Sequence, residues 1–340
     1  MTKHLYRPQV KSHAQAGLSL VELMVSIAIG LALMVIILQI FLGTKDAHRV
    51  TENQSRLQEN GRYIMEEMAR DIRMAGYLGC SKNARINLMV KGTAGSWATF
   101  NEPIHGYETV TSTMGLSSAE VLSGTDVIRI QRSSAADSNL TGNLVSDNAN
   151  IKIDSNPEGF ADGETLIVSD CASADVFCAN NVSSGGGQVT ITHASSCNEG
   201  TAPKLSKLYG TNAQVMRLST NIYYIGTGTG GCKAYMLCRK TLSGSSLVVE
   251  ELIDNVENMQ LEYGEDIDGD FNANRFLSAA SVSDWNNIVS VRLNILLRSN
   301  SANLATSPQP YTLNGTVTTP TDYRIRRVFS STVTLRNRTL

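Results

Sequence analysis

The stretch Gly17-Leu18-Ser19-Leu20-Val21-Glu22 opens an apolar run that continues to Leu42, and Glu22 is the only formal charge in that run. A helix formed by the 25 residues from Leu18 to Leu42 is about 37 Å long, which is enough to cross a hydrocarbon core of about 30 Å. A carboxylate at the centre of such a span costs about 2.5–3.5 kcal/mol, so an acid inside a membrane span indicates a function. The organisation of the whole chain depends on this segment.

The residues before the run form a basic leader. Lys3, Arg7 and Lys11 lie in residues 1–17, which contain no acidic residue. Because basic residues stay on the cytoplasmic side of a membrane, we expect the rest of the chain to lie outside the cytoplasm. A secretory signal peptide is the alternative. The apolar run is much longer than the 7–15 residues typical of a signal peptide, and Phe41-Leu42-Gly43 is a poor cleavage site.

Composition excludes one class of partner and indicates a compartment. The chain has 340 residues, of which 42% are hydrophobic, and a net charge of −2. It is long enough to bury a large core, and the charge balance gives no reason to expect direct binding to a nucleic acid. All the cysteines lie after residue 79, which indicates an oxidising compartment and up to three disulfides.

The pairing of the cysteines is open, because six cysteines allow 15 pairings. The short spacing of Cys232 and Cys238 favours a disulfide between these two. The other disulfide candidates are Cys80, Cys171, Cys178 and Cys197. A zinc site is disfavoured because no C-x-x-C pair occurs and the histidines are scattered.

The helix is predicted to continue beyond the apolar run. Apolar residues recur at spacings of three, four and seven, which gives a single apolar stripe on a polar helix: Val50, Leu57, Ile64, Met68, Ile72 and Ala75. Gly76 and Gly79 are typical of a helix end, so one helix is predicted from Leu18 to Ala75, about 87 Å long if unbroken. Such a stripe favours packing against a sheet over a free coiled coil, which would need strict heptads.

The remainder of the chain is predicted to be rich in β-structure. Segments rich in Val, Ile, Leu, Thr and Tyr are expected to be strands at 125–131, 164–169, 188–192, 213–225, 234–241, 258–263, 288–298 and 328–335. Turns are expected at 183–187, 226–231 and 244–246, and a long loop at 300–321. The predicted fold class is α+β, with a long N-terminal helix packed against an antiparallel sheet. A large insertion between the helix and the sheet has room to form a second lobe.

One loop has the composition of a cation site. Asp266, Asp268, Asp270 and Asn272 place side-chain oxygens at alternate positions, as calcium loops do. The match is partial, because Gly269 is in the fourth place instead of the sixth and Leu277 stands where an EF-hand has a bidentate Glu. A solvated acidic turn is the reading we favour. No cofactor is required, and calcium is the one cofactor that this loop could take.

The sequence gives no evidence of a catalytic function. No G-x-S-x-G, H-E-x-x-H or P-loop motif is present, and no His is paired with a nucleophile in the sequence. The glycine-rich segments 183–187 and 226–231 are not followed by a helical pattern, so they are interpreted as turns and not as phosphate-binding loops. We therefore expect a protein that is not an enzyme.

The junction at residue 17 resembles the type III signal of type IV prepilins. In that signal a basic leader ends in Gly, and the mature segment has Glu at its fifth residue, which is Glu22 when Leu18 is counted as the first. The resemblance implies cleavage after Gly17 by a prepilin peptidase and methylation of the new amine of Leu18. The chain departs from the family by starting its mature segment with Leu where Phe is more frequent, and by having a longer leader than many members.

Two further segments are similar to PilW-type minor pilins. They are 57–80, which includes Leu57-Gln58-Glu59-Asn60-Gly61-Arg62, and the closing segment 323–338, which includes Tyr323-Arg324-Ile325-Arg326-Arg327. The resemblance implies four regions: a leader (1–17), a membrane-spanning and filament-core half of the helix (18–43), an amphipathic outer half (44–79) and a disulfide-containing β-rich head (80–340).

The resemblance also implies a function. A minor pilin of this kind takes part in initiating type IV pilus assembly and can remain at the pilus tip, in support of motility, adhesion or DNA uptake. Its implied partners are other minor and major pilins, the prepilin peptidase and the inner-membrane assembly platform. The protein would cross the inner membrane once, with its head in the periplasm, and later reach the pilus at the cell surface. The alternatives are a type II secretion pseudopilin and a tip adhesin with a calcium-sensitive head.

A partner for Glu22 follows from helix geometry. Cleavage would create an ammonium group on Leu18, one helical turn before Glu22 and near the positive end of the helix dipole. Glu22 could pair with the amine of its own chain or with the amine of a neighbouring subunit. The sequence does not separate these two possibilities.

Overall fold

The computed structural model describes residues 19–79, 85–91, 100, 102–108, 110, 115–134, 138–170, 172–244 and 246–339. The chain divides into two compact units, Met1–Glu52 and Asn53–Leu340, and the division lies within helix α1 (Leu20–Met74). We call the second unit the globular unit. The two units are described separately, and the region boundaries expected at residues 18, 44 and 80 stay predictions.

The described part of the first unit is helical, and it is mostly apolar up to Leu42. Ser19 is the N-cap of α1, because its Oγ accepts a hydrogen bond from the Glu22 N–H at 3.1 Å. The large apolar side chains from Leu20 to Leu42 are all exposed within the chain. This part of α1 is long and apolar enough to cross a membrane, by length and composition.

The part of α1 in the globular unit buries the predicted stripe from Leu57 onward, whereas Val50 belongs to the first unit and is half-buried. Its buried residues are Leu57, Gly61, Ile64, Met68, Ala69, Asp71 and Ile72. The helix ends at Met74, and Gly76 follows with a φ of +76°, a conformation that glycine adopts at little cost. The Gly76 N–H donates to the Gln131 carbonyl at 2.9 Å, which ties the end of the helix to the sheet.

The larger sheet has nine strands, and its main path runs β1-β7-β6-β10-β11-β12. Its strands are β1 (Arg85–Leu88), β2 (Ile104–Tyr107), β3 (Val127–Ser133), β4 (Ser138–Asn139), β6 (Thr165–Ser169), β7 (Ser173–Cys178), β10 (Gln214–Ile225), β11 (Leu237–Ser243) and β12 (Ser246–Ile253). The long strand β10 pairs with β6 and β4 through its first half and with β3 and β11 through its second half. It therefore joins two parts of the globular unit.

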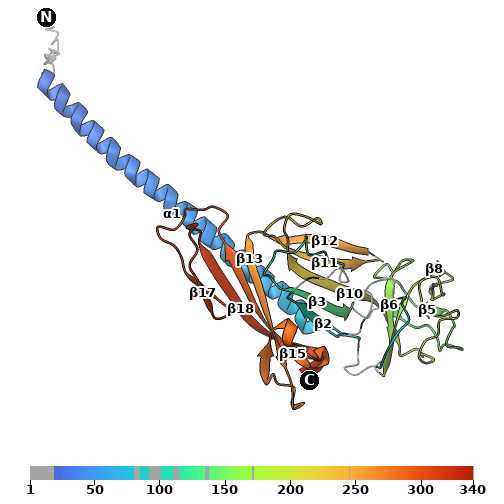
Figure 1. The fold of residues 1–340 in the computed structure, drawn as a ribbon. Helices are drawn as coiled ribbons and strands as arrows, with labels where there is room; N and C mark the ends of the chain where they lie inside the picture. Colours follow the sequence, from blue (N-terminus) through green and yellow to red (C-terminus); the bar gives the residue numbers. More distant parts are fainter. Residues whose placement is uncertain are drawn as a thin grey trace, which may run out of the picture. The chain divides into compact units, whose positions relative to one another are not determined.

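A four-stranded antiparallel sheet has the order β14-β13-β15-β18. Its strands are β14 (Arg275–Leu277), β13 (Val256–Glu265), β15 (Ile288–Arg298) and β18 (Arg326–Thr334). One hydrophobic core contains α1 residues such as Ile64 and Met68 together with residues of β13 and β15 and with Tyr223 and Ile225 of β10. The globular part of α1 thus runs between this sheet and the second half of β10 (Figure 1).

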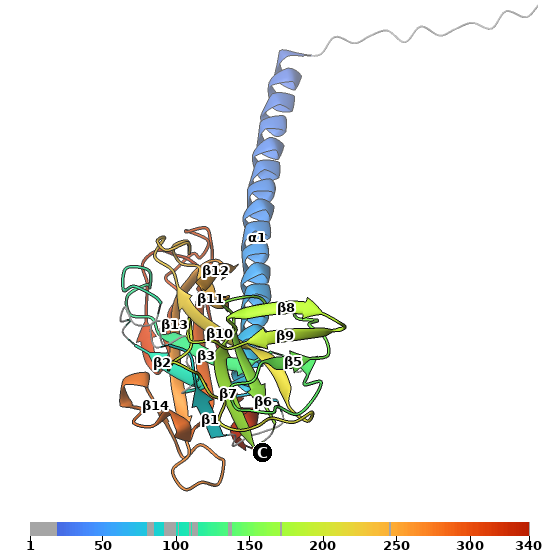
Figure 2. The same cartoon turned by 90° about the vertical axis from the view of Figure 1, so that its right-hand side faces the viewer.

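The insertion after α1 has a hydrophobic core of its own. A three-stranded sheet of β5 (Ile151–Ile153), β9 (Gln188–Thr192) and β8 (Asn181–Gly185) lies beside β6 in Figure 2. Its side chains pack with those of β6 and the start of β10, and all residues of this core lie between Met89 and Val215. This core forms the second lobe for which the sequence left room.

Short elements complete the fold. They are the hairpin β16 (Tyr311–Leu313) and β17 (Thr316–Thr318), the 3-10 helices η4 (Ala279–Ser281) and η5 (Trp285–Asn287), and the C-terminal helix α2 (Arg336–Thr339). The Asn337 amide donates to the carbonyls of Met74 and Ala75 at 3.4 and 3.1 Å. The end of the chain thus caps the last turn of α1, where carbonyls lack partners within the helix.

The predicted α+β class is confirmed, with four corrections of detail. The sheets are antiparallel except for β1 and β7, which pair in parallel. The expected loop 300–321 contains the hairpin β16–β17, and residues 183–185 of the expected turn belong to β8. Strand β12, like β2 and β7, lies outside the predicted segments. Its sequence Ser246–Ile253 shows little alternation of polar and apolar residues, although Leu247 and Val249 on one face are half-buried.

Candidate functional site

The N-terminal assembly segment is the first candidate site. Gly17 and Leu18 lie outside the described residues, and Glu22 lies in the first turn of α1. The Ser26 hydroxyl donates to the Glu22 carbonyl at 2.7 Å, while the Glu22 carboxylate has no ion-pair partner among the described residues, which do not include Leu18. A free carboxylate on an apolar, exposed helix is a group that gains from a cationic partner.

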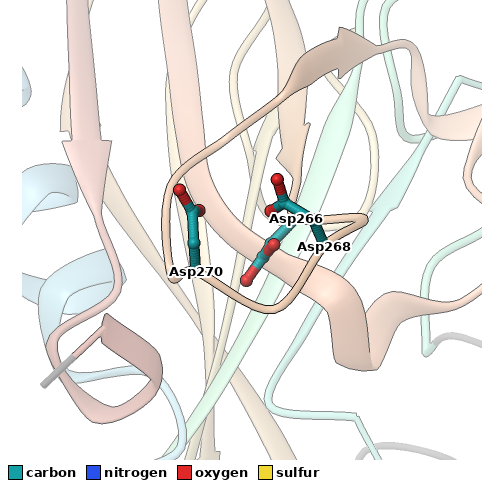
Figure 3. A group of neighbouring side chains, drawn as sticks. All are labelled: Asp266, Asp268 and Asp270. Atoms are coloured by element: carbon teal, nitrogen blue, oxygen red, sulfur yellow. The ribbon is translucent and has the colours of Figure 1, made fainter.

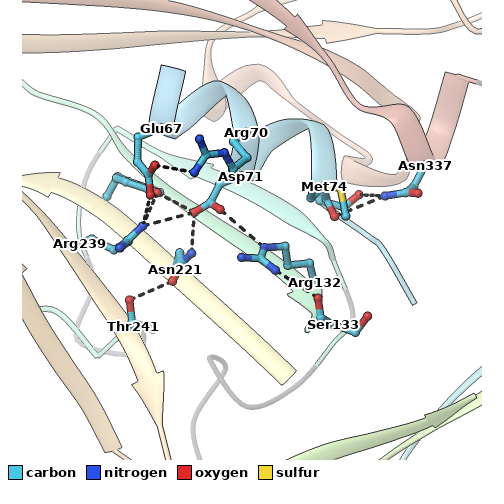
Figure 4. A network of polar contacts seen from close by, with 12 residues as sticks. Glu67, Arg70, Asp71, Met74, Arg132, Ser133, Asn221, Arg239, Thr241 and Asn337 are labelled. Atoms are coloured by element: carbon cyan, nitrogen blue, oxygen red, sulfur yellow. Dashed lines mark hydrogen bonds and ion pairs between the residues drawn. The ribbon is translucent and has the colours of Figure 1, made fainter. Parts of the chain in front are cut away.

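A buried ionic network holds the outer half of α1 in the globular unit (Figure 4). Asp71 is only 3% exposed, and its Oδ2 accepts hydrogen bonds from Asn221 Nδ2 and Tyr223 Oη, each at 2.6 Å. Arg132 Nε and Arg239 Nη1 lie 3.6 and 4.0 Å from the same carboxylate. Because a buried charge is tolerated only when it is paired and hydrogen-bonded, these contacts fix the rotation of the helix on the sheet.

The network extends from the helix to the edge of the larger sheet. Arg239 on β11 bonds Glu67 of α1 at 2.8 Å and Glu250 of β12 at 2.8 Å. Burial, followed by the negative charge of Asp71, raises the pKa of Tyr223 well above its usual value, so its hydroxyl stays a hydrogen-bond donor at any physiological pH. The sequence reasoning missed Asp71, although its place between Met68 and Ile72 on the apolar stripe was a usable signal.

A glycine permits close approach of the last strand to α1. A Cβ atom on Gly61 would collide with the ring of Phe329 on β18. Gly61 belongs to the 57–80 segment that is similar to PilW-type proteins, and Phe329 follows the basic segment near the end of the chain. The segments 57–80 and 323–338, which carry the resemblance, therefore meet in the fold.

The acidic loop between β13 and β14 brings three carboxylates together. One oxygen from each of Asp266, Asp268 and Asp270 lies within 4.8 Å of the others (Figure 3). The Asp266 carboxylate already accepts backbone N–H groups from Gly269 at 2.8 Å and Phe271 at 2.9 Å. Asn272 donates its N–H to the Asp270 carboxylate at 2.8 Å, so the loop is held by its own hydrogen bonds. The solvated acidic turn stays a prediction, with a calcium site as its alternative.

Two disulfides are described. Cys232 and Cys238 are paired, as the sequence favoured, and Cys178 is paired with Cys197, which the sequence left open. Cys80 and Cys171 lie outside the described residues. The expected oxidising compartment is consistent with these bonds.

Comparison with known proteins gives two family matches, one toward each end of the chain. Residues 222–337 match the model of the type IV pilus-assembly protein W family, and residues 12–38 match the prokaryotic N-terminal methylation motif. The first match contains β18 and most of the closing segment, and the second contains Gly17, Leu18 and Glu22. Neither match includes residues 57–80.

A type IV-like pilin from Thermus thermophilus is a structural neighbour at 14% identity and a TM-score of 0.22, over 53% of this chain and 86% of that one. At that TM-score the likeness carries no argument about the fold. No curated protein matches the chain. The two family models agree with the resemblance read from the sequence, and together they support a type IV pilus minor pilin of the PilW kind.

Proposed function

We propose that this protein is a minor pilin that helps to initiate type IV pilus assembly, with a place at the pilus tip. A role of pilins in pilus assembly is what the two family models support, and initiation and tip location are the finer part of the proposal. The observation that carries it is the apolar half of α1, which is fully exposed within the chain and follows directly on the methylation motif. Apolar surface of this extent needs either lipid or other helices around it.

Processing would supply Glu22 with a partner. Cleavage after Gly17 by a prepilin peptidase would leave a cationic amine on Leu18, and transfer into a filament would replace lipid by the helices of other pilins. In both settings the apolar surroundings strengthen attraction between the amine and the carboxylate. The proposed sequence is therefore insertion in the inner membrane with the globular unit in the periplasm, contact with the assembly platform, and then packing with other pilins.

Substitution of Glu22 tests the proposal. Glu22→Ala should leave a membrane-inserted protein with an intact globular unit, because Glu22 belongs to the first unit and is exposed there, and it should reduce the amount of this protein in sheared pili. Glu52→Ala is the matched control, since Glu52 is an exposed acid of the same helix outside the apolar run. Equal amounts of wild type and Glu22→Ala in sheared pili would remove the proposal.

Two further experiments separate the alternatives. Gly17→Ala should accumulate a precursor that is heavier by the 17 leader residues, and a mature species from that variant would show that the junction is misplaced. Deletion of the gene should abolish surface pili and twitching. Loss of protein secretion with normal pili would favour the type II secretion pseudopilin, and normal piliation with lost surface attachment would favour the adhesin.

A further inference from the structure

Strand β12 ends the nine-stranded sheet with a free edge. Its one neighbour in the described part of the chain is β11, with regular pairing from Ser246↔Ser243 to Glu251↔Cys238 and an irregularity beyond that point. Alternate N–H and C=O groups of an edge strand point away from its neighbour and can pair with another strand. Figure 1 shows β12 on the outer side of β11.

The first four residues of β12, 246–249, lack the features that protect a sheet edge, since the charges of the strand and its irregularity come later, from Glu250 onward. Ser246-Leu247-Val248-Val249-Glu250-Glu251-Leu252-Ile253 contains no Pro, Gly, Lys or Arg, and Val248 is 54% exposed. Exposed edges that are long and apolar promote association, and soluble proteins usually interrupt them with such residues. The edge of β18 differs, because it begins with Arg326 and Arg327, and Arg326 stacks on Tyr311 of the β16–β17 hairpin.

A hollow lies beside this edge on the face of the sheet that meets α1. It has a volume of about 380 Å³ and is lined by Arg132, Ser219, Asn221, Arg239, Thr241, Ser243, Val248 and Glu250. The lining residues come from β3, β10, β11 and β12, so the hollow crosses the sheet up to the free edge. A strand added to β12 would place every second side chain at the rim of this hollow.

Charge at the edge indicates the chemistry of the added strand. Glu250 is 55% exposed on its side chain, and Arg239 bonds only its Oε2, at 3.2 Å from Nε and 2.8 Å from Nη2. No group in the described residues donates to Glu250 Oε1. A basic side chain opposite Glu250 and an apolar one opposite Val248 would complete this edge.

We propose that β12 takes an extended strand from a different pilin subunit, with a basic and an apolar side chain two residues apart. A second copy of this chain is disfavoured, because β12 contains no Lys or Arg, so a β12 strand paired with its own copy would place no basic side chain opposite Glu250. A filament also joins unlike surfaces of successive subunits, which a two-fold contact does not do. This inference rests on the proposed pilin function and names one surface through which subunits meet.

Photo-crosslinking in cells tests the pairing with the full chain. A benzoylphenylalanine at Ser246, on the same face of β12 as Val248, should form a product with another pilin, identified by mass spectrometry. The control position is Val317 of β17, which is 69% exposed and lies in a different sheet. A product with a second copy of this chain, a product with a protein that is not a pilin, or no product would each overturn the proposal.

A substitution at the edge gives a second measurement. Val248→Lys places a charge where an apolar contact is expected, and the yield of the Ser246 product should fall about tenfold, which corresponds to about 1.4 kcal/mol. Val317→Lys should not change that yield, and thermal unfolding of each variant shows whether the fold persists. An unchanged yield in folded Val248→Lys contradicts the pairing. If the yield is unchanged in folded Val248→Lys but Glu22→Ala still lowers pilus incorporation, the strand pairing is wrong and the proposed function stands.

Discussion

Asp71→Ala is the sharpest test of how the globular unit holds its helix. The substitution leaves Asn221 Nδ2 and Tyr223 Oη without the carboxylate oxygen that each now contacts at 2.6 Å. Each buried donor without a partner costs about 1–3 kcal/mol, which sums to about 2–6 kcal/mol. Removing one partner of a buried ion pair costs about 3–5 kcal/mol in other proteins. We therefore expect a loss of about 3–5 kcal/mol in the free energy of unfolding.

Urea unfolding of a fragment that begins at Asn53 measures this loss, and in a thermal scan Tm should fall by roughly 6–20 °C. Arg70→Ala is the control, because the Arg70 side chain is 73% exposed and its one ion pair among the described residues is with Glu67, at 3.3 Å. Surface ion pairs of that kind contribute about 0–1 kcal/mol. If Asp71→Ala stays within about 1 kcal/mol of the wild type, the buried network does not hold the helix and the reasoning is wrong.

Three further predictions concern other parts of the globular unit. Burial raises the pKa of Asp126 to about 6, although the hydrogen bond that its carboxylate accepts from the Leu261 N–H acts in the opposite direction. In the unfolded chain the pKa of Asp126 is about 4. The contribution of Asp126 to the free energy of unfolding is therefore full below about pH 4 and is lost as pH rises through about 6. Asp126→Asn should therefore gain about 2–3 kcal/mol over the wild type between pH 4 and pH 7, measured by urea unfolding at both values, and a constant difference would contradict the assignment. Gly61→Ala should destabilise by up to about 2 kcal/mol, since overpacking against Phe329 outweighs the gain in helix propensity, and Phe329→Leu should relieve the loss in a double-mutant cycle. Calorimetry with calcium should give no heat, because Asp266 is already bonded within its loop, and measurable binding would establish the metal site.

Periodicity accounts for what the sequence predicted well. The stripe of Leu57, Ile64, Met68 and Ile72 is buried as expected, because one apolar face of a helix has only one way to leave water. Strand β15 occurs at the predicted residues 288–298, because Leu293, Ile295 and Leu297 recur at every second position and are buried. An eleven-residue segment with this alternation fits a strand and not a helix.

Contacts between distant segments account for what the sequence did not predict. Cys178 and Cys197 are 19 residues apart, and only the packing of the second lobe selects this pairing. Asp71 gained its partners from β10, β11 and β3, which follow it by 60 or more positions in the sequence. Local patterns contain no information about such partners, so the buried network had to come from the structure.

The helix is used in two opposite ways, and this explains why a single acid in each half matters. In the outer half Asp71 is buried and fully partnered, so its charge is satisfied within the chain and contributes to folding. In the inner half Glu22 lies among exposed apolar side chains, with no ion-pair partner in the described residues, so satisfying its charge is left to processing or to another subunit. Substitution of Asp71 should therefore lower the free energy of unfolding of the globular unit, and any effect on pili should follow from that loss. Substitution of Glu22 should reduce pilus incorporation without changing the free energy of unfolding. A variant of Glu22 that unfolds the globular unit would show that folding and assembly are not separated in this way.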